Sequence, residues 1–368
     1  MKISLVEPTI EKDDVEAMLT ACREGGIVRG ELAVEFEQKL AKYFNMAGAR
    51  LTNSGTTALH LALLALEIKP GDEIILPTYT CVALLNAINY IQAKPVFVDN
   101  YFEPEQMDFN LSIEAVKAKI TKRTKAIIVP HMFGVPAQIN KLLNLGISII
   151  EDGTLSLGVL LKGKPIGSFG DISVFSFHAS KVIAAGEGGV ILAKKRKHMQ
   201  KIKEMLEWEE EQIKIRAAHK RKIKYIIGYN YRLNDIGAAL GLNQWQKLRQ
   251  LIRVRQTIAK TYYQSFEKIK NIVIPDPKKG LSNTYFRYLI CLKNQKTVQV
   301  IEKFRQKGIE VGRGVYPPLH YYQKMQTGTF PNAEKAVASL ISLPIYPVLT
   351  EKAIKYIINS AIRILSDE

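Results

Sequence analysis

A short apolar run that ends in two carboxylates, Ile147-Ser148-Ile149-Ile150-Glu151-Asp152, lies near the middle of the chain. Its isoleucines are typical of a buried strand of a parallel sheet. Open α/β sheets bind their ligands beyond the carboxyl ends of such strands. The sequence therefore predicts a strand over residues 147–150 that brings Asp152 to a ligand site. Taken alone, Asp152 is equally compatible with a helix N-cap or a turn.

The second informative run ends in a lysine. It reads Ser176-Phe177-His178-Ala179-Ser180-Lys181 and is followed by Gly186-Glu187-Gly188-Gly189. The alternating residues 173–177 predict a strand that delivers this loop to a sheet edge. A solvated surface lysine is the alternative, since the chain has 52 Lys and Arg residues. A lysine that forms a Schiff base and an acid that holds a pyridinium nitrogen are the protein groups that pyridoxal phosphate chemistry requires. Lys181 and Asp152 together therefore indicate a site for pyridoxal 5'-phosphate.

Apolar runs alternate with helical patterns over much of the chain. The runs that look like strands are 72–77, 95–99, 126–130, 147–150, 172–177 and 189–193. This alternation is typical of βαβ units and predicts an α/β fold with a mostly parallel, buried sheet. The pattern changes after about residue 240, to a long helical stretch over 240–270 and then a mixed pattern that includes 285–292 and 296–307. We therefore expect a large domain over residues 1–245 and a smaller domain over residues 246–368.

Composition narrows the class of protein. The chain has 368 residues and is 47% hydrophobic, enough for one large core and a smaller second one. No apolar run approaches the roughly 20 residues of a membrane helix, and the amino terminus does not match a signal peptide, so we expect a soluble, cytoplasmic protein with no membrane partner. The three cysteines are widely spaced and the six histidines are scattered, so neither a disulfide framework nor a metal site is predicted.

The net charge of +17 brings a polyanionic partner into consideration. Much of the excess is local, in Lys194-Lys195-Arg196-Lys197 and in Lys220-Arg221-Lys222-Ile223-Lys224, which bracket a segment that also contains Glu207 and Glu209-Glu210-Glu211. Charges of both signs in one segment are typical of a solvated helix. Nucleic acid is not the expected partner, although charge alone does not separate an enzyme from a nucleic-acid binder. A positive field would also attract a doubly charged pyrophosphate substrate.

Two further segments carry hydrogen-bond donors. The run Thr52-Asn53-Ser54-Gly55-Thr56-Thr57-Ala58-Leu59 opens a helical pattern, and amides at a helix start suit a phosphate. An ordinary Ser or Thr N-cap is the alternative. Ser176 offers another hydroxyl to the same phosphate. The run Gly228-Tyr229-Asn230-Tyr231-Arg232-Leu233-Asn234-Asp235 supplies donors before the next helix, or is simply a capped loop.

An ordered set of motifs runs along nearly the whole chain. Its members are Arg29-Gly30-Glu31, Phe36-Glu37, Ser54-Gly55-Thr56-Thr57-Ala58-Leu59, Gly71-Asp72-Glu73-Ile74-Ile75-Leu76-Pro77, Pro95-Val96-Phe97-Val98-Asp99, Glu151-Asp152, Gly170-Asp171, Phe175-Ser176-Phe177, Lys181, Gly186-Glu187-Gly188-Gly189, Asn230-Tyr231-Arg232-Leu233 and Pro318-Leu319-His320. The set resembles the DegT/DnrJ/EryC1/StrS family of sugar aminotransferases, which are fold-type-I pyridoxal phosphate enzymes. The resemblance implies a large domain with a mostly parallel seven-stranded sheet flanked by helices, and a smaller α+β C-terminal domain.

The resemblance also implies roles for individual residues. Lys181 would bind the cofactor covalently and, once released, move the proton between the donor carbon and the cofactor. Asp152 would stay ionised and keep the pyridine nitrogen protonated. Gly55, Thr56 and Ser176 would hold the phosphate.

Three more residues have implied roles around the same site. Asn230 would come from the second subunit of a homodimer, so that the active sites are shared. Tyr316 and His320 would line the cleft for the sugar nucleotide. A core tyrosine and a surface histidine are equally compatible with these two positions.

Two residues depart from the family pattern at expected cofactor contacts. Cys81 stands where an aromatic residue usually stacks on the pyridine ring, and Leu155 stands where a glutamine usually lies near the phenolic oxygen of the cofactor. A thiol is polarisable and can still cover a ring face, whereas leucine cannot donate a hydrogen bond. The departures mark either a subfamily with a different substrate or a weakened transaminase.

The resemblance implies a ping-pong transamination with glutamate as amino donor and a nucleotide-linked keto-sugar as acceptor. The product would be an amino-sugar for a surface polysaccharide or another glycan. The alternatives are a non-catalytic sugar-nucleotide-binding or regulatory protein on the same scaffold, an amino-acid-metabolising enzyme of this fold, and a sugar dehydratase that uses pyridoxal phosphate. A related 3-dehydratase branch has histidine in place of the cofactor lysine, so Lys181 counts against it.

Overall fold

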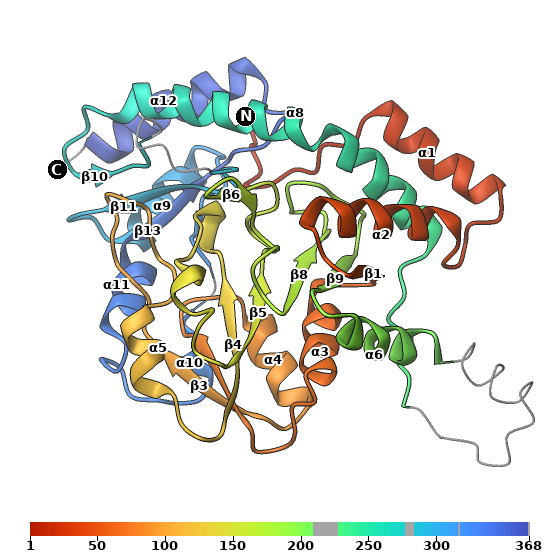
Figure 1. Cartoon of the computed structure of the whole chain (residues 1–368). Coiled ribbons are helices and arrows are strands. Elements are labelled where there is room, and N and C mark those ends of the chain that lie inside the picture. The colour runs from red at the N-terminus through yellow and green to blue at the C-terminus, as the bar shows by residue number, and fades with distance from the viewer. Residues whose placement is uncertain (209–226, 277–282, 316, 367–368) are drawn as a thin grey trace, which may run out of the picture.

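The computed structural model describes residues 1–208, 227–276, 283–315 and 317–366. A seven-stranded sheet forms its centre, as Figure 1 shows. Its strands lie in the order β1 (Gly48–Thr52), β9 (Gly189–Ala193), β8 (Ile172–Ser176), β5 (Ser148–Asp152), β4 (Thr124–Pro130), β2 (Glu73–Pro77) and β3 (Lys94–Val98). Only β9 runs antiparallel to its neighbours β1 and β8, and the other pairs are parallel. The predicted mostly parallel sheet is confirmed.

The six predicted strands are all present, with ends that differ by at most two residues from the prediction. The edge strand β1 was not predicted. Its residues Gly48-Ala49-Arg50-Leu51-Thr52 form a short run that a polar Arg50 interrupts. The structure accommodates that side chain in an ion network at the sheet edge, described below.

Helices cover both faces of this sheet. One face carries α3 (Gly55–Ala65), α4 (Val82–Tyr90) and α6 (Arg196–Leu206), and the other carries α2 (Glu31–Phe44), α5 (Ile113–Lys119) and the first half of α8 (Asp235–Phe266). Successive residues of a strand point to opposite faces. On β8, Val174 therefore packs on the α3 side, whereas Phe175 packs against Phe44 of α2.

The C-terminal part of the chain forms a second, smaller unit. Its antiparallel sheet has the order β10 (Ile272–Val273), β11 (Tyr288–Leu292), β13 (Leu340–Leu343) and β12 (Gly312–Arg313). Its helices are α9 (Thr297–Gln306), α10 (Leu319–Tyr322), α11 (Pro331–Ser339) and α12 (Glu351–Ser366). The remaining elements are α1 (Lys12–Arg23), the short helices η1 (Met132–Gly134) and η2 (Ile139–Lys141), and the hairpin of β6 (Leu160–Leu161) and β7 (Lys164–Pro165).

The expected boundary between residues 245 and 246 falls inside α8, a single helix of 32 residues. Figure 1 shows α8 running from α1 and α2 to α12. Its first half packs on α1 and α2, while Ile258, Tyr262 and Phe266 belong to the core of the smaller unit. Ile3 also joins that core and bridges to Ile309. The change of pattern near residue 240 thus reflects a change of packing partner along one helix, and the amino terminus belongs with the smaller unit.

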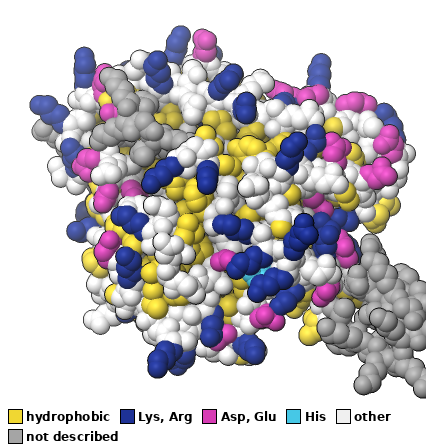
Figure 2. Space-filling model, viewed as in Figure 1, with side chains coloured by type: hydrophobic (Ala, Val, Ile, Leu, Met, Phe, Trp, Pro, Cys, Tyr) yellow, Lys and Arg dark blue, Asp and Glu magenta, His cyan; other side chains and the backbone are white. Residues whose placement is uncertain are grey.

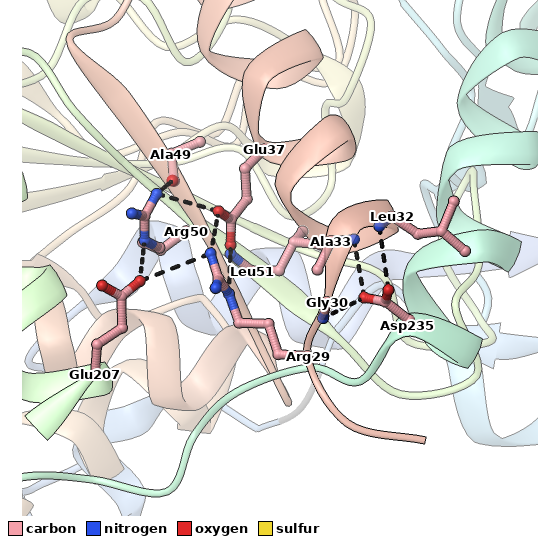
Figure 3. Close-up of polar contacts among 10 residues, drawn as sticks. All are labelled: Arg29, Gly30, Leu32, Ala33, Glu37, Ala49, Arg50, Leu51, Glu207 and Asp235. Carbon is pink, nitrogen blue, oxygen red and sulfur yellow. Dashed lines mark hydrogen bonds and ion pairs between the residues drawn. The ribbon is translucent and has the colours of Figure 1, made fainter. Parts of the chain in front are cut away.

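Buried charges fix the edge of the large sheet, as Figure 3 shows. The Glu37 carboxylate is 3% exposed and lies 2.8 Å from Arg29 and 3.1 Å from Arg50. It also accepts a hydrogen bond of 2.9 Å from the Leu51 amide of β1. Glu207 closes the network with a 3.0 Å contact to Arg50. Because a buried carboxylate is stable only when paired, this network locks α2 onto β1, the strand that leads to Ser54.

A second carboxylate in Figure 3 caps α2 from outside that helix. Asp235 accepts hydrogen bonds from the amides of Gly30 at 2.7 Å, Leu32 at 3.1 Å and Ala33 at 3.0 Å. A Cβ on Gly30 would lie 2.6 Å from the Asp235 carboxylate, so this position requires glycine. Asp235 is also the first residue of α8, and it therefore joins the starts of two helices.

We predict that Asp235→Ala lowers the free energy of unfolding by about 1–3 kcal/mol, because it leaves orphan amide donors at the start of α2. Chemical denaturation measures this change. Glu16→Ala is the matched control, since Glu16 makes only a surface pair with Arg23 and is 64% exposed. Equal stabilities for the two variants would contradict the capping role of Asp235.

The predicted mixed-charge helix between the two basic runs lies largely outside the described residues, which stop at 208 and resume at 227. In Figure 2, Lys and Arg side chains are scattered over the face shown, with Asp and Glu among them. Among the described residues, no helix is both long enough and apolar enough to cross a membrane.

Candidate active site

A cavity of about 620 Å³ opens beyond the carboxyl ends of β5 and β8. Its walls come from the start of α3, the start of α4, the loop after β8 and the smaller unit. Seven of the predicted site residues line it, namely Gly55, Thr56, Cys81, Asp152, Leu155, Ser176 and Lys181. These residues come from four separate segments of the sequence, and the fold brings them to one place.

The start of α3 forms one wall. Ser54 is the N-cap, and its hydroxyl accepts a hydrogen bond of 3.1 Å from the Thr57 amide. The first amides of a helix have no partner within the helix, and the helix dipole favours an anion there. A Cβ on Gly55 would come within 3.0 Å of Ser176, and one on Gly189 within 2.6 Å of Ser54. Glycines at these positions let the helix start and the strand ends meet closely enough to hold a phosphate.

Strand alternation separates the two carboxylates at the end of β5. Asp152 lines the cavity, whereas Glu151 is fully buried and accepts hydrogen bonds from the amides of Gly167, Phe169 and Gly170. Burial raises the pKa of Glu151, but hydrogen bonds from His131 and from these amides outweigh it and lower the pKa overall. Glu151 is therefore an anchor for the loop after β7, outside the cavity.

No sequence motif pointed to His131, which completes this anchor. Its Nδ1 accepts a hydrogen bond of 2.9 Å from the Ala137 amide, so its proton lies on Nε2, 3.1 Å from Glu151. The His131 amide in turn donates to the Asp152 carbonyl over 3.1 Å. The buried pair thus holds the backbone of Asp152 in place.

The two charged groups at the base of the cavity affect each other. Burial raises the pKa of Asp152, and hydrogen bonds from Thr154 and the charge of Lys181 oppose that shift. Burial lowers the pKa of Lys181, and Cys81 and Asp152 oppose that shift, while Arg287 adds to it. The Lys181 ammonium also lies 5.0 Å from the centroid of the Phe286 ring. A lysine with a lowered pKa supplies more neutral, nucleophilic amine than an exposed one does.

Both departures from the family pattern lie on the cavity wall. Cys81 is the N-cap residue of α4, and burial raises the pKa of its thiol, which keeps the thiol neutral. Leu155 also faces the cavity, near Asp152 in sequence. At the position of the family's usual ring-stacking aromatic residue, this chain therefore has a small thiol. At the position of the family's usual hydrogen-bonding glutamine, it has an aliphatic side chain.

The structure does not bring Asn230 or His320 to the cavity. Asn230 is exposed, in a segment held by a 2.7 Å hydrogen bond from the Asn53 amide to the Tyr231 carbonyl. His320 is fully buried, with Nδ1 2.7 Å from the Thr78 hydroxyl and Nε2 3.3 Å from Glu334. Tyr316 lies outside the described residues.

Several cavity residues were not predicted from the sequence. They are His178, Glu187, Phe286, Arg287 and Arg313, together with smaller lining residues. The arginines lie in the smaller unit, and nothing in the sequence distinguishes them from the other basic residues. Only the packing of the two units reveals them.

One cluster of three carboxylates occurs among the described residues, at Glu11, Asp13 and Asp14. The Lys247 ammonium lies 3.0 Å from Glu11, 3.0 Å from Asp13 and 2.8 Å from Asp14. The cluster therefore has its own cation, and it clamps α1 to α8.

The fold and the cavity define an α/β enzyme of the pyridoxal phosphate class. At one edge of the large sheet, a lysine, an acid and a helix start that suits an anion line the same cavity. The model of the DegT/DnrJ/EryC1/StrS aminotransferase family matches residues 8–362, and the chain belongs to that family. The sequence-based identification of the family and of the fold is confirmed.

Three similar proteins illustrate the family. A GDP-perosamine synthase from Escherichia coli O157:H7 is 33% identical, over 92% of this chain and 92% of its own. The putative sugar aminotransferase Spr1654 from Streptococcus pneumoniae, solved in its PLP form, is 25% identical with a TM-score of 0.85, over 99% of this chain and 98% of its own. PseC from Helicobacter pylori, an aminotransferase of pseudoaminic acid biosynthesis, is 26% identical with a TM-score of 0.87, over 99% of each chain. The predictions of an aminotransferase and of pyridoxal phosphate as its cofactor are confirmed at the level of the family.

The residues of the cavity fit that cofactor. The α3 start, with Ser176, suits a phosphate, Asp152 suits a pyridinium nitrogen, and Lys181 suits an aldehyde carbon. When bound, the cofactor supplies an electron sink for a carbanion at the donor carbon. The neutral thiol of Cys81 adds no charge to the cavity wall.

The lowered pKa of Lys181 predicts the pH dependence of cofactor capture. Only the neutral amine attacks an aldehyde, so the rate of capture by cofactor-free protein should rise with pH and reach its midpoint below the ordinary lysine value of 10.5. Stopped-flow absorbance over a pH series measures the rate of capture, and Nα-acetyl-lysine, which has a free side-chain amine, is the reference. A midpoint no lower than that of the reference amine would contradict the proposed effect of burial.

Proposed function

We propose that this chain is an aminotransferase that converts a nucleotide-linked keto-sugar into an amino-sugar, with glutamate as amino donor. It would act as a cytoplasmic homodimer in the synthesis of a surface polysaccharide. The observation that carries this proposal is the meeting of Lys181, Asp152 and the start of α3 in one cavity.

Each of these groups has a separate task. The Lys181 amine would take a proton from the donor carbon and return it on the cofactor side, and its lowered pKa favours the neutral amine that this exchange needs. The Asp152 carboxylate would hold the pyridinium nitrogen, whose positive charge offsets the cost of burying the acid. Gly55, Thr56 and Ser176 would hold the phosphate.

The names of the relatives support the choice of acceptor. Three of the curated relatives, at 31–33% identity, are GDP-perosamine synthases. A keto-sugar linked to guanosine diphosphate is therefore the first acceptor to test, followed by keto-sugars linked to uridine and thymidine diphosphates.

The position of Asn230 supports a shared active site. The segment that contains Asn230 lies against the start of α3 in the same chain, through the hydrogen bond from the Asn53 amide to the Tyr231 carbonyl. The Asn230 side chain is nevertheless exposed. A residue held beside one site but facing solvent is suitably placed to serve a second subunit. We propose that Asn230 donates a hydrogen bond to the phosphate in the partner's site.

We propose different roles for the two residues expected in the sugar cleft. Tyr316 remains a proposed substrate contact. His320 is sealed in the interior, where it bonds Thr78, and the Leu319 amide donates to the Thr78 carbonyl over 2.7 Å. We propose that His320 positions the preceding segment, in which Pro317 lines the cavity, and does not contact the sugar itself.

The transfer of nitrogen tests the function. The protein would be mixed with nitrogen-15-labelled glutamate and each nucleotide-linked keto-sugar, and the sugar nucleotides would be analysed by mass spectrometry. The proposal predicts a labelled amino-sugar from at least one acceptor. Conversion of the cofactor by glutamate without labelling of any sugar nucleotide would favour an enzyme of amino-acid metabolism.

We predict that Lys181→Ala abolishes covalent retention of the cofactor after borohydride reduction and lowers turnover by at least about 1000-fold, because no other amine replaces it as proton carrier. Mass spectrometry of the reduced protein reports the attachment. Lys260→Ala, an exposed position on α8, is the control. A soluble Lys181→Ala variant that transaminates at the wild-type rate would remove Lys181 from the mechanism.

We also predict that Asn230→Ala weakens cofactor binding about tenfold, by loss of one hydrogen bond to a charged group, and only under conditions where a dimer forms. Absorbance titration combined with analytical ultracentrifugation measures both quantities. Asn359→Ala, on the exposed side of α12, is the matched control. Unchanged affinity in a confirmed dimer would exclude Asn230 from the phosphate site.

A further inference from the structure

The smaller unit contributes a cationic wall to the cavity. Phe286 and Arg287 precede β11, and Arg313 lies on β12. The strands fix these positions, because Tyr288 pairs with Leu343 on β13 and is fully buried. The roles proposed above for cofactor binding and proton transfer use the large unit alone, and they leave these two arginines without a task.

Arg287 lies close to the reacting lysine. The Lys181 ammonium and the Arg287 guanidinium carbon each lie 5.0 Å from the centroid of the Phe286 ring. The two cations are therefore separated by no more than twice that distance. The charge of Arg287 also contributes to the lowered pKa of Lys181, as expected for neighbouring cations.

The other charged groups of the cavity are less suited to bind a carboxylate beside Lys181. Asp152 faces the pyridinium position, and Glu187 lies 3.6 Å from His178 in the loop that carries Lys181. Arg313 is exposed at the cavity wall, whereas Arg287 is half-buried. Among the described lining residues, Arg287 thus combines a permanent positive charge, partial burial and proximity to Lys181.

The amino donor brings carboxylates into this cavity. Its amino group must reach the carbon that Lys181 serves, so its carboxylates enter the space next to that lysine. A guanidinium binds a carboxylate through two parallel hydrogen bonds, and a partly buried site strengthens them. The Arg287 guanidinium carbon lies over the Phe286 ring, 5.0 Å from its centroid, which is within cation–π range.

We propose that Arg287 binds a carboxylate of the amino-acid donor and so selects the donor. This inference rests on the proposed transamination, and it adds a specificity-determining residue from the smaller unit. Donor recognition then depends on how the two units pack, since Lys181 belongs to one and Arg287 to the other.

The first experiment measures binding without turnover. Glutarate carries both carboxylates of glutamate but no amino group, and its dissociation constant can be measured by calorimetry on the cofactor-loaded protein. Arg287→Gln should weaken glutarate binding about 10–100-fold, and Arg287→Lys should weaken it less, because lysine keeps the charge but not the two-bond geometry. Arg305→Gln, an exposed arginine on α9, should leave it unchanged.

The second experiment follows the conversion of the bound cofactor in single turnovers. With glutamate, Arg287→Gln should raise the half-saturating concentration by a similar factor. With butylamine, which lacks a carboxylate, wild type and variant should react alike. Failure of the wild type to react with glutamate would count against the proposed function, whereas the glutarate measurement still decides the role of Arg287.

Three results would overturn the inference. One is unchanged affinity of Arg287→Gln for glutarate and glutamate. Another is weaker binding of guanosine diphosphate by Arg287→Gln with unchanged binding of glutarate, which would assign the guanidinium to the diphosphate of the acceptor. An equal loss with butylamine would also contradict it, because the effect would then lie in the chemistry at Lys181.

Discussion

The coupled pair of Lys181 and Asp152 is the constraint on which the candidate site depends. Burial shifts both groups toward their neutral forms, and each charge opposes the shift of the other. An unpaired charge in that position would be costly, so the two groups are stable together or with a cofactor between them. The sheet brings Asp152 and Lys181 together because β5 and β8 are neighbouring strands that end side by side, and both side chains lie on the α3 side.

Other buried charges support this arrangement from behind. Glu151 and His131 hold the backbone of Asp152, on the face of the strand opposite the cavity. Glu37 of α2 accepts a hydrogen bond from β1, the strand that leads to Ser54 at the start of α3. Both carboxylates are fully bonded, so they act as rigid anchors and do not compete for the cofactor. The precision of the site thus comes from polar contacts far apart in the sequence.

The sequence predicted the parts of the molecule that local pattern determines. Strand alternation identified the sheet, and the order of the motifs identified the family and the residues around Lys181. The strand pattern alone could not separate Glu151 from Asp152, because both end the same strand. The family resemblance selected Asp152, and in the structure Asp152 lines the cavity whereas Glu151 does not. The family resemblance placed His320 in the sugar cleft, whereas the structure buries it. The sequence could not show this burial, because it depends on a contact with Thr78, which is distant in the chain. Arg287 had no local signal at all, because its position follows from the packing of the smaller unit on the larger.

The most direct test of the account is the visible absorption spectrum of the purified protein with pyridoxal phosphate, before and after glutamate. The account predicts a band from cofactor bound covalently at Lys181, which glutamate converts to that of the aminated cofactor. A protein that forms no such band would contradict it, because Cys81 and Leu155 would then have cost the cavity its cofactor and the scaffold would be a binding protein.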